Sequence, residues 1–349
     1  MNRNKMITAV AVATVACGMF AGCAPRSTDA VIRIENNGKK DSLDYGYVNF
    51  VCRMNQARVD QANLANMGKG YWSQTAQTGS NETNEDSAKD YIYQNIQGQY
   101  LARQHAADLG VKVTASDKKK IKKAAADFMK DNTKKAIDQV GAKEEYIEDF
   151  LEYETYYERV RAKVESSADD TVSDSEAKQS TFTYALFSTK SDSKSASGDS
   201  SISKEDKEKL LAKAKKVASA SDFDKEAKKL KAETSTYSFT RAEDPGSDQA
   251  MDEKVITEAK KLVDGQVSGV IEVKDKGYYV IRMDKTYDEA ATKTKRKSLA
   301  EQKREEAFSK QMTSWKKKVK FTLNKKLWKQ IKFTDLFTTK QTKNSDTGK

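Results

Sequence analysis

Apolar side chains between residues 41 and 164 recur every three or four positions, which is the spacing of amphipathic helices. Asp41 and Ser42 are suitable N-caps for a first helix, which we expect to end near Gly68. A second helix is predicted over residues 84–109, and a third begins after Thr114 or Ser116. The next helix is broken at Val140-Gly141, and another runs to about residue 164. Residues 31–35 alternate like a strand. This half of the chain is otherwise expected to be all-helical.

The pattern changes after a polar hinge at residues 166–180. Strands are predicted at residues 181–188, 234–241, 267–273 and 277–283, and helices at residues 204–218, 222–230 and 251–262. This order describes a compact α+β domain over residues 181–285 with a polar loop at 188–203. A basic helix over 288–315, a strand-like segment at 319–323 and a short helix around Trp328 follow. Residues 338–349 form a polar tail that we expect to be disordered.

Residues 1–23 have the pattern of an export leader. Arg3 and Lys5 form a charged start, and the apolar run that follows, to Phe20, is too short for a membrane-spanning helix. The small residues before Cys23 make the end of this leader similar to a bacterial lipobox, in which the cysteine is lipidated. The sequence therefore predicts a lipoprotein signal peptide and a lipid anchor at Cys23, on the extracytoplasmic face of a bacterial cell membrane. An ordinary secretory signal with a chance cysteine is the alternative.

The charge balance narrows the class of partner. The chain of 349 residues carries 63 basic and 52 acidic side chains, a net charge of +11. The surplus is concentrated between residues 292 and 332, where 15 Lys and Arg stand against three acidic residues. For an exported protein, this excess favours an anionic membrane or cell-wall surface over nucleic acid.

Few residues are available for metal or nucleophilic chemistry. One histidine and three cysteines cannot assemble a His-rich metal centre or a zinc finger, so we expect no metal site and no cofactor. Cys52 is the cysteine that remains after leader removal and lipidation, and we expect it to be a small buried helix residue. His105 is expected to be structural or solvated.

Three stretches together resemble the PrsA and SurA type of exported foldase. LARQHAADLGVKVTASDKKKIKKAA followed by VGAKEEYIEDFLEYETYYERVRAKV is similar to their helical chaperone domain. DFDKEAKKL and LVDGQVSGVIEVKDKGYYVIRMD are similar to a parvulin domain, the prolyl isomerase fold of these proteins. The long C-terminal helix that ends in a strand fits the same family. The resemblance implies an α+β multidomain protein, in which residues 31–165 and 288–335 form an all-helical chaperone domain and residues 181–285 an inserted parvulin-like domain.

The resemblance also implies a site for isomerising X-Pro peptide bonds. Parvulins use two inward-facing histidines, a nearby Cys or Asp, and an apolar pocket for the proline ring. The two histidine positions fall on Tyr184 and Tyr279, and the substrate-binding positions fall on Leu186, Phe239, Met251 and Val255. The Cys or Asp position cannot be assigned, and Glu233 is a weak candidate. Tyrosine keeps a flat ring and a hydroxyl donor, so a pocket without imidazole is conceivable.

Two functions stay open on these grounds. The first is a membrane-anchored foldase that assists unfolded or partly folded exported proteins and isomerises prolyl bonds. The second is a non-catalytic holdase whose parvulin domain has lost its chemistry, because both family histidines are replaced. Core packing is the favoured explanation for the four-residue spacing of Met251 and Val255. A homodimer is also left open. The helical first half argues against a two-lobed solute-binding lipoprotein.

Overall fold

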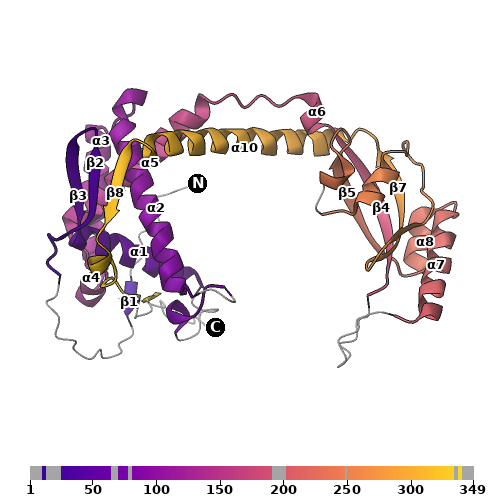
Figure 1. Cartoon of the computed structure of the whole chain (residues 1–349), viewed down its shortest axis with the longest axis horizontal. Coiled ribbons are helices and arrows are strands. Elements are labelled where there is room, and N and C mark those ends of the chain that lie inside the picture. Colours follow the sequence, from indigo (N-terminus) through magenta and orange to yellow (C-terminus); the bar gives the residue numbers. More distant parts are fainter. Residues whose placement is uncertain are drawn as a thin grey trace, which may run out of the picture. The chain divides into compact units, whose positions relative to one another are not determined.

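The computed structural model describes residues 10–12, 25–63, 70–77, 81–190, 202–247, 250–333 and 337–339. The chain divides into two compact units (Figure 1): unit 1 contains residues 1–167 and 306–349, and unit 2 contains residues 168–305. Helix α10 (Glu289–Lys316) contributes to both. Each unit combines helices with an antiparallel sheet, so the predicted α+β class is confirmed.

The predicted leader lies largely outside the described residues, and Cys23 with it. Within that segment, β1 (Val10–Val12) pairs antiparallel with β9 (Phe337–Thr339). Residues 340–349 of the predicted tail also lie outside. No helix in the described part of the chain is long and apolar enough to cross a bilayer.

Several helices of unit 1 begin or end at residues that the sequence predicts. The helices of this unit are α1 (Tyr45–Asn63), α2 (Asn84–His105), α3 (Ala115–Asp131), α4 (Lys134–Val140), α5 (Glu144–Ser166), α11 (Lys325–Trp328) and the short 3-10 turns η2 (Tyr71–Ser73) and η3 (Ala107–Leu109). Thr83 and Asp86 form a capping box at α2, and Thr114 and Asp117 form one at α3. Both lie at helix starts that the sequence predicts. Gly141 ends α4 with φ 66°.

Unit 1 also contains a three-stranded sheet, so the expectation of an all-helical domain is wrong. Its strands are β2 (Ala30–Asn36), β3 (Lys39–Asp44) and β8 (Val319–Leu323), in the order β3-β2-β8. The predicted N-caps Asp41 and Ser42 lie in β3, and α1 begins at Tyr45 instead. The physical reason is the Asn37-Gly38 turn, whose positive φ values of 48° and 77° fold β3 back onto β2.

The core of unit 1 is aromatic where α1 meets α5. Phe50 packs edge-on against Phe150 at 6.2 Å between ring centroids, and Tyr47 lies 6.3 Å from Tyr146. Cys52 is fully buried here, and burial raises the pKa of its thiol to about 12. The thiol is therefore inert at neutral pH, as expected for a packing residue.

His105 holds two segments of unit 1 together. Its ring stacks on Trp315 of α10 with 4.4 Å between centroids, and its Nδ1 lies 3.0 Å from Asp108 Oδ2. These contacts agree with the structural role expected for this residue.

Unit 2 is built on a four-stranded sheet. Its strands are β4 (Gln179–Ser188), β5 (Glu233–Thr240), β6 (Ile271–Val273) and β7 (Gly277–Lys285), in the antiparallel order β5-β4-β7-β6. Its helices, besides α10, are α6 (Asp174–Ala177), α7 (Lys204–Ala218), α8 (Phe223–Lys229), α9 (Glu253–Ala259) and the 3-10 turn η4 (Pro245–Ser247). Strand β6 is shorter than the predicted 267–273, because Val267 makes only an isolated bridge to Arg282.

The two faces of this sheet carry separate cores. Ala185, Phe187 and Val280 pack in one cluster with residues of α7 and α8. These two helices lie together beside the sheet (Figure 1). Phe182, Tyr279, Ile281 and Met283 face α9. Strand side chains alternate between faces, so neighbouring residues such as Tyr278 and Tyr279 belong to different cores.

Candidate functional site

All six residues predicted for the prolyl site lie in one apolar cluster, on the sheet face that α9 covers. They are Tyr184 and Leu186 on β4, Phe239 on β5, Met251 just before α9, Val255 within α9, and Tyr279 on β7. The structure therefore brings together residues that are almost 100 positions apart in the sequence.

Strand register places the two tyrosines as diagonal neighbours. Tyr279 is opposite Leu186, and Tyr184 is opposite Ile281 two positions further along the pair of strands. The two tyrosine rings lie 5.7 Å apart between centroids with an angle of 51° between their planes. Side chains two residues apart on adjacent strands are within reach of each other when they are aromatic. The pair therefore follows directly from the register.

The six residues differ in how accessible they are. Val255 is fully buried and Phe239 is 3% exposed, so these two support the face from within. Tyr184 and Leu186 are half-buried and present their side chains at the surface of the cluster.

Tyr237 is a further accessible aromatic residue, which the sequence analysis missed. It is half-buried on β5, opposite Phe182, with 5.7 Å between the two ring centroids. The signal that could have identified it is alternation, because Tyr237 lies two residues before Phe239 on the same strand and so on the same face. The accessible part of the face is thus a row of Leu186, Tyr184 and Tyr237.

The hydroxyls of Tyr184 and Tyr279 make no hydrogen bond within the described residues. The buried polar atoms that lack a partner in this part of the chain are Gln97 Oε1 and Gln139 Oε1, so the Tyr279 Oη is not sealed inside the protein. Burial raises the pKa of Tyr279, and the nearby Tyr184, Asp252 and Glu233 raise it further. The hydroxyl is therefore a neutral donor at physiological pH.

Glu233 is the acidic residue at the end of this face. It is exposed on β5, directly opposite Leu186. Asp252, which also acts on Tyr279, caps α9 and accepts a hydrogen bond from the Lys254 backbone N–H at 3.1 Å. The sole histidine of the chain is in unit 1. The face can hold an apolar ring and donate hydrogen bonds, but it has no imidazole for proton transfer.

A cavity of about 460 Å³ lies beside this face, between α9 and the chain that leads into β6. Glu253, Glu258 and Glu272 line it together with Gly269 and Ile271. None of the six predicted residues contributes to it. We call the sheet face that presents Tyr184, Leu186, Tyr237 and Tyr279 the tyrosine face. The tyrosine face and this cavity are therefore separate features of unit 2.

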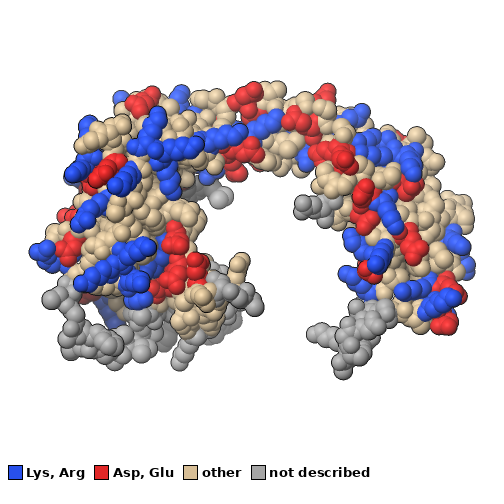
Figure 2. All heavy atoms as spheres, in the orientation of Figure 1, with Lys and Arg blue, Asp and Glu red and all other residues tan. Residues whose placement is uncertain are grey.

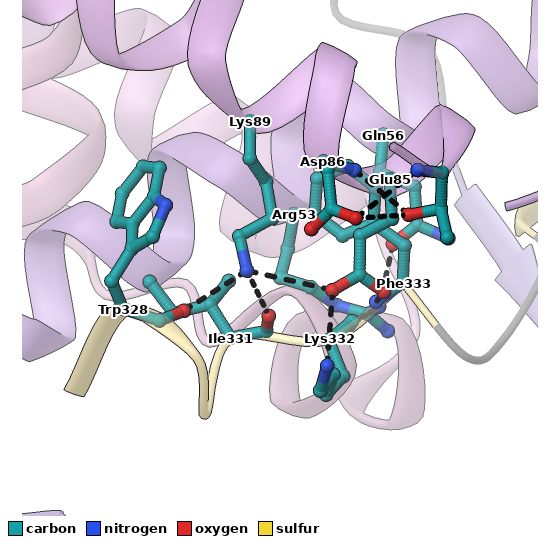
Figure 3. A network of polar contacts seen from close by, with 10 residues as sticks. Arg53, Gln56, Glu85, Asp86, Lys89, Trp328, Ile331, Lys332 and Phe333 are labelled. Atoms are coloured by element: carbon teal, nitrogen blue, oxygen red, sulfur yellow. Dashed lines mark hydrogen bonds and ion pairs between the residues drawn. The ribbon is translucent and has the colours of Figure 1, made fainter. Parts of the chain in front are cut away.

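A cluster of buried polar residues in unit 1 was not predicted from the sequence (Figure 3). Lys89 is 3% exposed, and its Nζ donates to the main-chain oxygens of Trp328 and Ile331 at 3.0 and 2.8 Å. The same Nζ lies 3.4 Å from Glu85, which also accepts the Phe333 backbone N–H at 3.0 Å. Burial lowers the pKa of Lys89, and the Glu85 carboxylate opposes that shift.

The cluster continues through α1. Arg53 donates to the Lys332 main-chain oxygen at 2.6 Å and to Gln56. Asp60 accepts from the Trp72 indole N–H at 2.9 Å and from the Phe337 backbone N–H at 3.0 Å. Burial raises the pKa of Asp60, while these hydrogen bonds oppose the rise. Because the polar atoms are engaged with main-chain groups, this cluster fixes the C-terminal segment and offers no reactive group.

No family model and no curated protein matches the chain. Similar solved structures include the foldase protein PrsA from Lactococcus lactis, at 16% identity over 87% of this chain and 99% of that one, with a TM-score of 0.33. The peptidylprolyl isomerase PrsA from Bacillus anthracis is 21% identical over 65% of this chain and 96% of that one, with a TM-score of 0.28. A SurA-like chaperone from Campylobacter jejuni is 10% identical over 84% of this chain and 99% of that one, with a TM-score of 0.27.

These structures are of the PrsA and SurA kind, which is the resemblance that the sequence indicates. All three identities are below 25% and all three TM-scores below 0.5.

Proposed function

We propose that this chain is a lipid-anchored extracytoplasmic foldase that binds extended, proline-containing segments of exported proteins on the tyrosine face of unit 2. The observation that carries the proposal is the Tyr184–Tyr279 pair, two rings 5.7 Å apart whose hydroxyls have no partner within the described residues. Lipid anchoring rests on the predicted lipobox at Cys23.

The apolar side chains supply a surface for a proline ring. Leu186, Tyr184 and Tyr237 are accessible and lie in a row, so an extended peptide can lie along them with its proline against an aromatic ring. Burial of that ring also withdraws the adjacent amide from water. Desolvation favours the twisted amide over the planar one, because twisting removes the resonance dipole.

The tyrosine hydroxyls supply the chemistry. Rotation about an X-Pro bond has a barrier of about 18–20 kcal/mol and needs no covalent step. In the planar amide the nitrogen lone pair is delocalised, whereas in the twisted amide it can accept a hydrogen bond. A neutral donor such as Tyr279 Oη would therefore stabilise the transition state more than the ground state, which is the condition for catalysis.

The alternative is a holdase that binds without isomerising. The absence of imidazole from unit 2 favours it. Unit 1 offers further contact area for unfolded segments, because Tyr91 on α2 is 65% exposed and Tyr157 on α5 is half-buried. In this version the tyrosine face is a binding surface only.

The test is prolyl isomerisation of a series of X-Pro peptides by the purified protein and by Tyr279→Phe and Tyr184→Phe. We expect the wild type to accelerate isomerisation and Tyr279→Phe to lose about tenfold, because only the hydroxyl is removed. Tyr278→Phe is the matched control, since Tyr278 faces the opposite core and should leave the rate unchanged.

A rate equal to buffer for every peptide would discard isomerisation and leave the holdase. Suppression of client aggregation then tests whether the protein acts as a holdase. The wild type should protect an unfolded client, and Tyr184→Ser combined with Leu186→Ser should protect it less. No acceleration and no protection together would end the foldase proposal.

A further inference from the structure

Lysines from two distant parts of the chain meet at one end of the sheet of unit 1. Asn36, the last residue of β2, pairs with Lys39 on one side and with Val319 on the other. The β2–β3 turn is therefore next to the segment that joins α10 to β8. Lys40 of β3 lines the same hollow as Lys317, Lys318 and Lys320.

Two hollows share Lys317, one at this end of the sheet and one along the last turns of α10. The larger has a volume of about 520 Å³ and is lined by Glu35, Asn37, Gly38, Lys40, Lys317, Lys318, Val319 and Lys320. The smaller has a volume of about 310 Å³ and is lined by Ser309, Lys310, Thr313, Ser314 and Lys317. We refer to the two together as the lysine groove.

The charge of the lysine groove is almost entirely positive. Glu35 is the sole acidic residue among those that line it, and it lies 3.8 Å from Lys320. Lys40, Lys310, Lys317 and Lys318 are exposed, and none forms an ion pair with another described residue. Lys and Arg side chains gather over β8 and the adjoining end of α10 in the space-filling view (Figure 2).

The sequence around the lysine groove adds further positive charge. Residues 307–334 contain nine lysines and no acidic residue. Cations grouped in a concave site repel each other and raise the local potential, which an anionic ligand relieves. The groove therefore has the electrostatic form of an anion-binding site.

We propose that the lysine groove binds a linear polyanion whose repeating units are joined by phosphodiesters. Lys310, Thr313 and Ser314 lie three and four residues apart on the last turns of α10, and Lys317 directly follows the helix, so two hydroxyl donors lie between two cations. Ammonium groups bind phosphate as point charges, and hydroxyls add hydrogen bonds to the free oxygens. A repeating row of donors matches a repeating anion.

The geometry favours a polymer over a membrane surface. A flat bilayer cannot enter a hollow, whereas a thin chain can. The large apolar side chains exposed in the described part of the molecule are Val59, Tyr91, Val263 and Tyr287. None lines the groove, so the site lacks the side chains with which a peripheral protein usually inserts into lipid. This inference is independent of the proposed isomerase site.

The test compares two triple variants with the same change in net charge. Lys317→Gln, Lys318→Gln and Lys320→Gln together remove three groove lysines. Lys325→Gln, Lys326→Gln and Lys329→Gln remove three exposed lysines that lie close in sequence but outside the groove. The probe is fluorescent poly(glycerol phosphate), with binding followed by anisotropy over a range of salt concentrations.

We expect the groove variant to bind about tenfold more weakly at physiological ionic strength, and its salt slope to fall by about two. The control variant should stay within about twofold of the wild type. Equal weakening in both variants would mean a diffuse charge effect and would overturn the proposal, as would absence of binding by the wild type. Groove-dependent binding to phosphatidylglycerol vesicles but not to the polymer would overturn it in favour of a membrane site.

Discussion

Units 1 and 2 both pack helices against an antiparallel sheet, yet different interactions hold them together. The charged side chains that are buried in the described part of the chain, Arg53, Asp60 and Lys89, all belong to unit 1. Buried polar side chains of unit 2, such as Gln179, Thr240 and Ser268, are neutral. Among the described residues, unit 2 thus buries no charged side chain, whereas unit 1 buries three that engage specific donors and acceptors.

The two units should tolerate different side-chain substitutions. An apolar core accepts another apolar side chain of similar volume at small cost. A buried charge does not accept such a replacement, because its former partners keep unsatisfied polar atoms. Substitutions should therefore change the stability of one unit without changing that of the other. Tryptophan fluorescence reports on unit 1, because Trp72, Trp315 and Trp328 are all in that unit.

The largest effect is expected at Phe182, which is fully buried between Tyr237 and Phe239 in unit 2. Phe182→Ala should lower the free energy of unfolding of unit 2 by about 3–5 kcal/mol, because it removes a large side chain and leaves a cavity. Urea unfolding followed by far-UV circular dichroism should show this loss, while the tryptophan transition stays in place. Phe182→Leu should recover most of the stability, and a shift of both transitions would contradict the separation of the two units.

The next effect is expected at Asp60 in unit 1. Asp60→Ala leaves the Trp72 indole N–H and the Phe337 backbone N–H without an acceptor, and should cost unit 1 about 2–4 kcal/mol. The tryptophan transition should move to lower urea concentration.

Two further variants sharpen the Asp60 prediction. Asp60→Leu should destabilise unit 1 as much as Asp60→Ala, since volume is not what the site lacks. Asp131→Ala, at an exposed position on α3, is the control and should have little effect. Rescue by leucine would show that unit 1 also tolerates apolar replacement, and the contrast between the units would disappear.

The smallest effect concerns Glu176 on α6 in unit 2. Hydrogen bonds from Ser173 and Lys303 lower the pKa of Glu176 from 4.5 to about 2. Because the pKa is lower in the folded state, the stabilisation is present above pH 4.5 and is lost as the pH falls towards 2. The stability difference between wild type and Glu176→Gln should shrink over this interval. Circular dichroism of urea unfolding at several pH values measures it, with Glu205→Gln as the control.

Much of the fold could be predicted because its signals are local. Thr114 with Asp117 marks the start of α3, and helix α7 and strand β8 have the predicted bounds. These features depend on residues a few positions apart, so the sequence pattern is sufficient. The grouping of Tyr184, Leu186 and Tyr279 was instead implied by the family resemblance, because no local pattern relates two strands that are almost 100 positions apart.

One of the features that were missed depends on distant partners. Lys89 appears as one polar residue of an amphipathic helix, and its acceptors at Trp328 and Ile331 are 239 and 242 positions away. Strand β3 is polar, without apolar alternation, and it forms because the Asn37-Gly38 turn returns it to β2. Asn-Gly is a strong hairpin signal, so β3 could have been found from that dipeptide.

The distance between Lys89 and its acceptors also has a consequence in time. A ribosome adds about 5–20 residues per second, so the 239 positions between Lys89 and Trp328 correspond to about 10–50 seconds of synthesis. During that interval the first helices of unit 1 exist without the segment that completes their core, while all of unit 2 is made. The protein that we propose as a foldase is therefore itself incompletely folded during its synthesis. Its last-synthesised segment completes the core that its first helices begin.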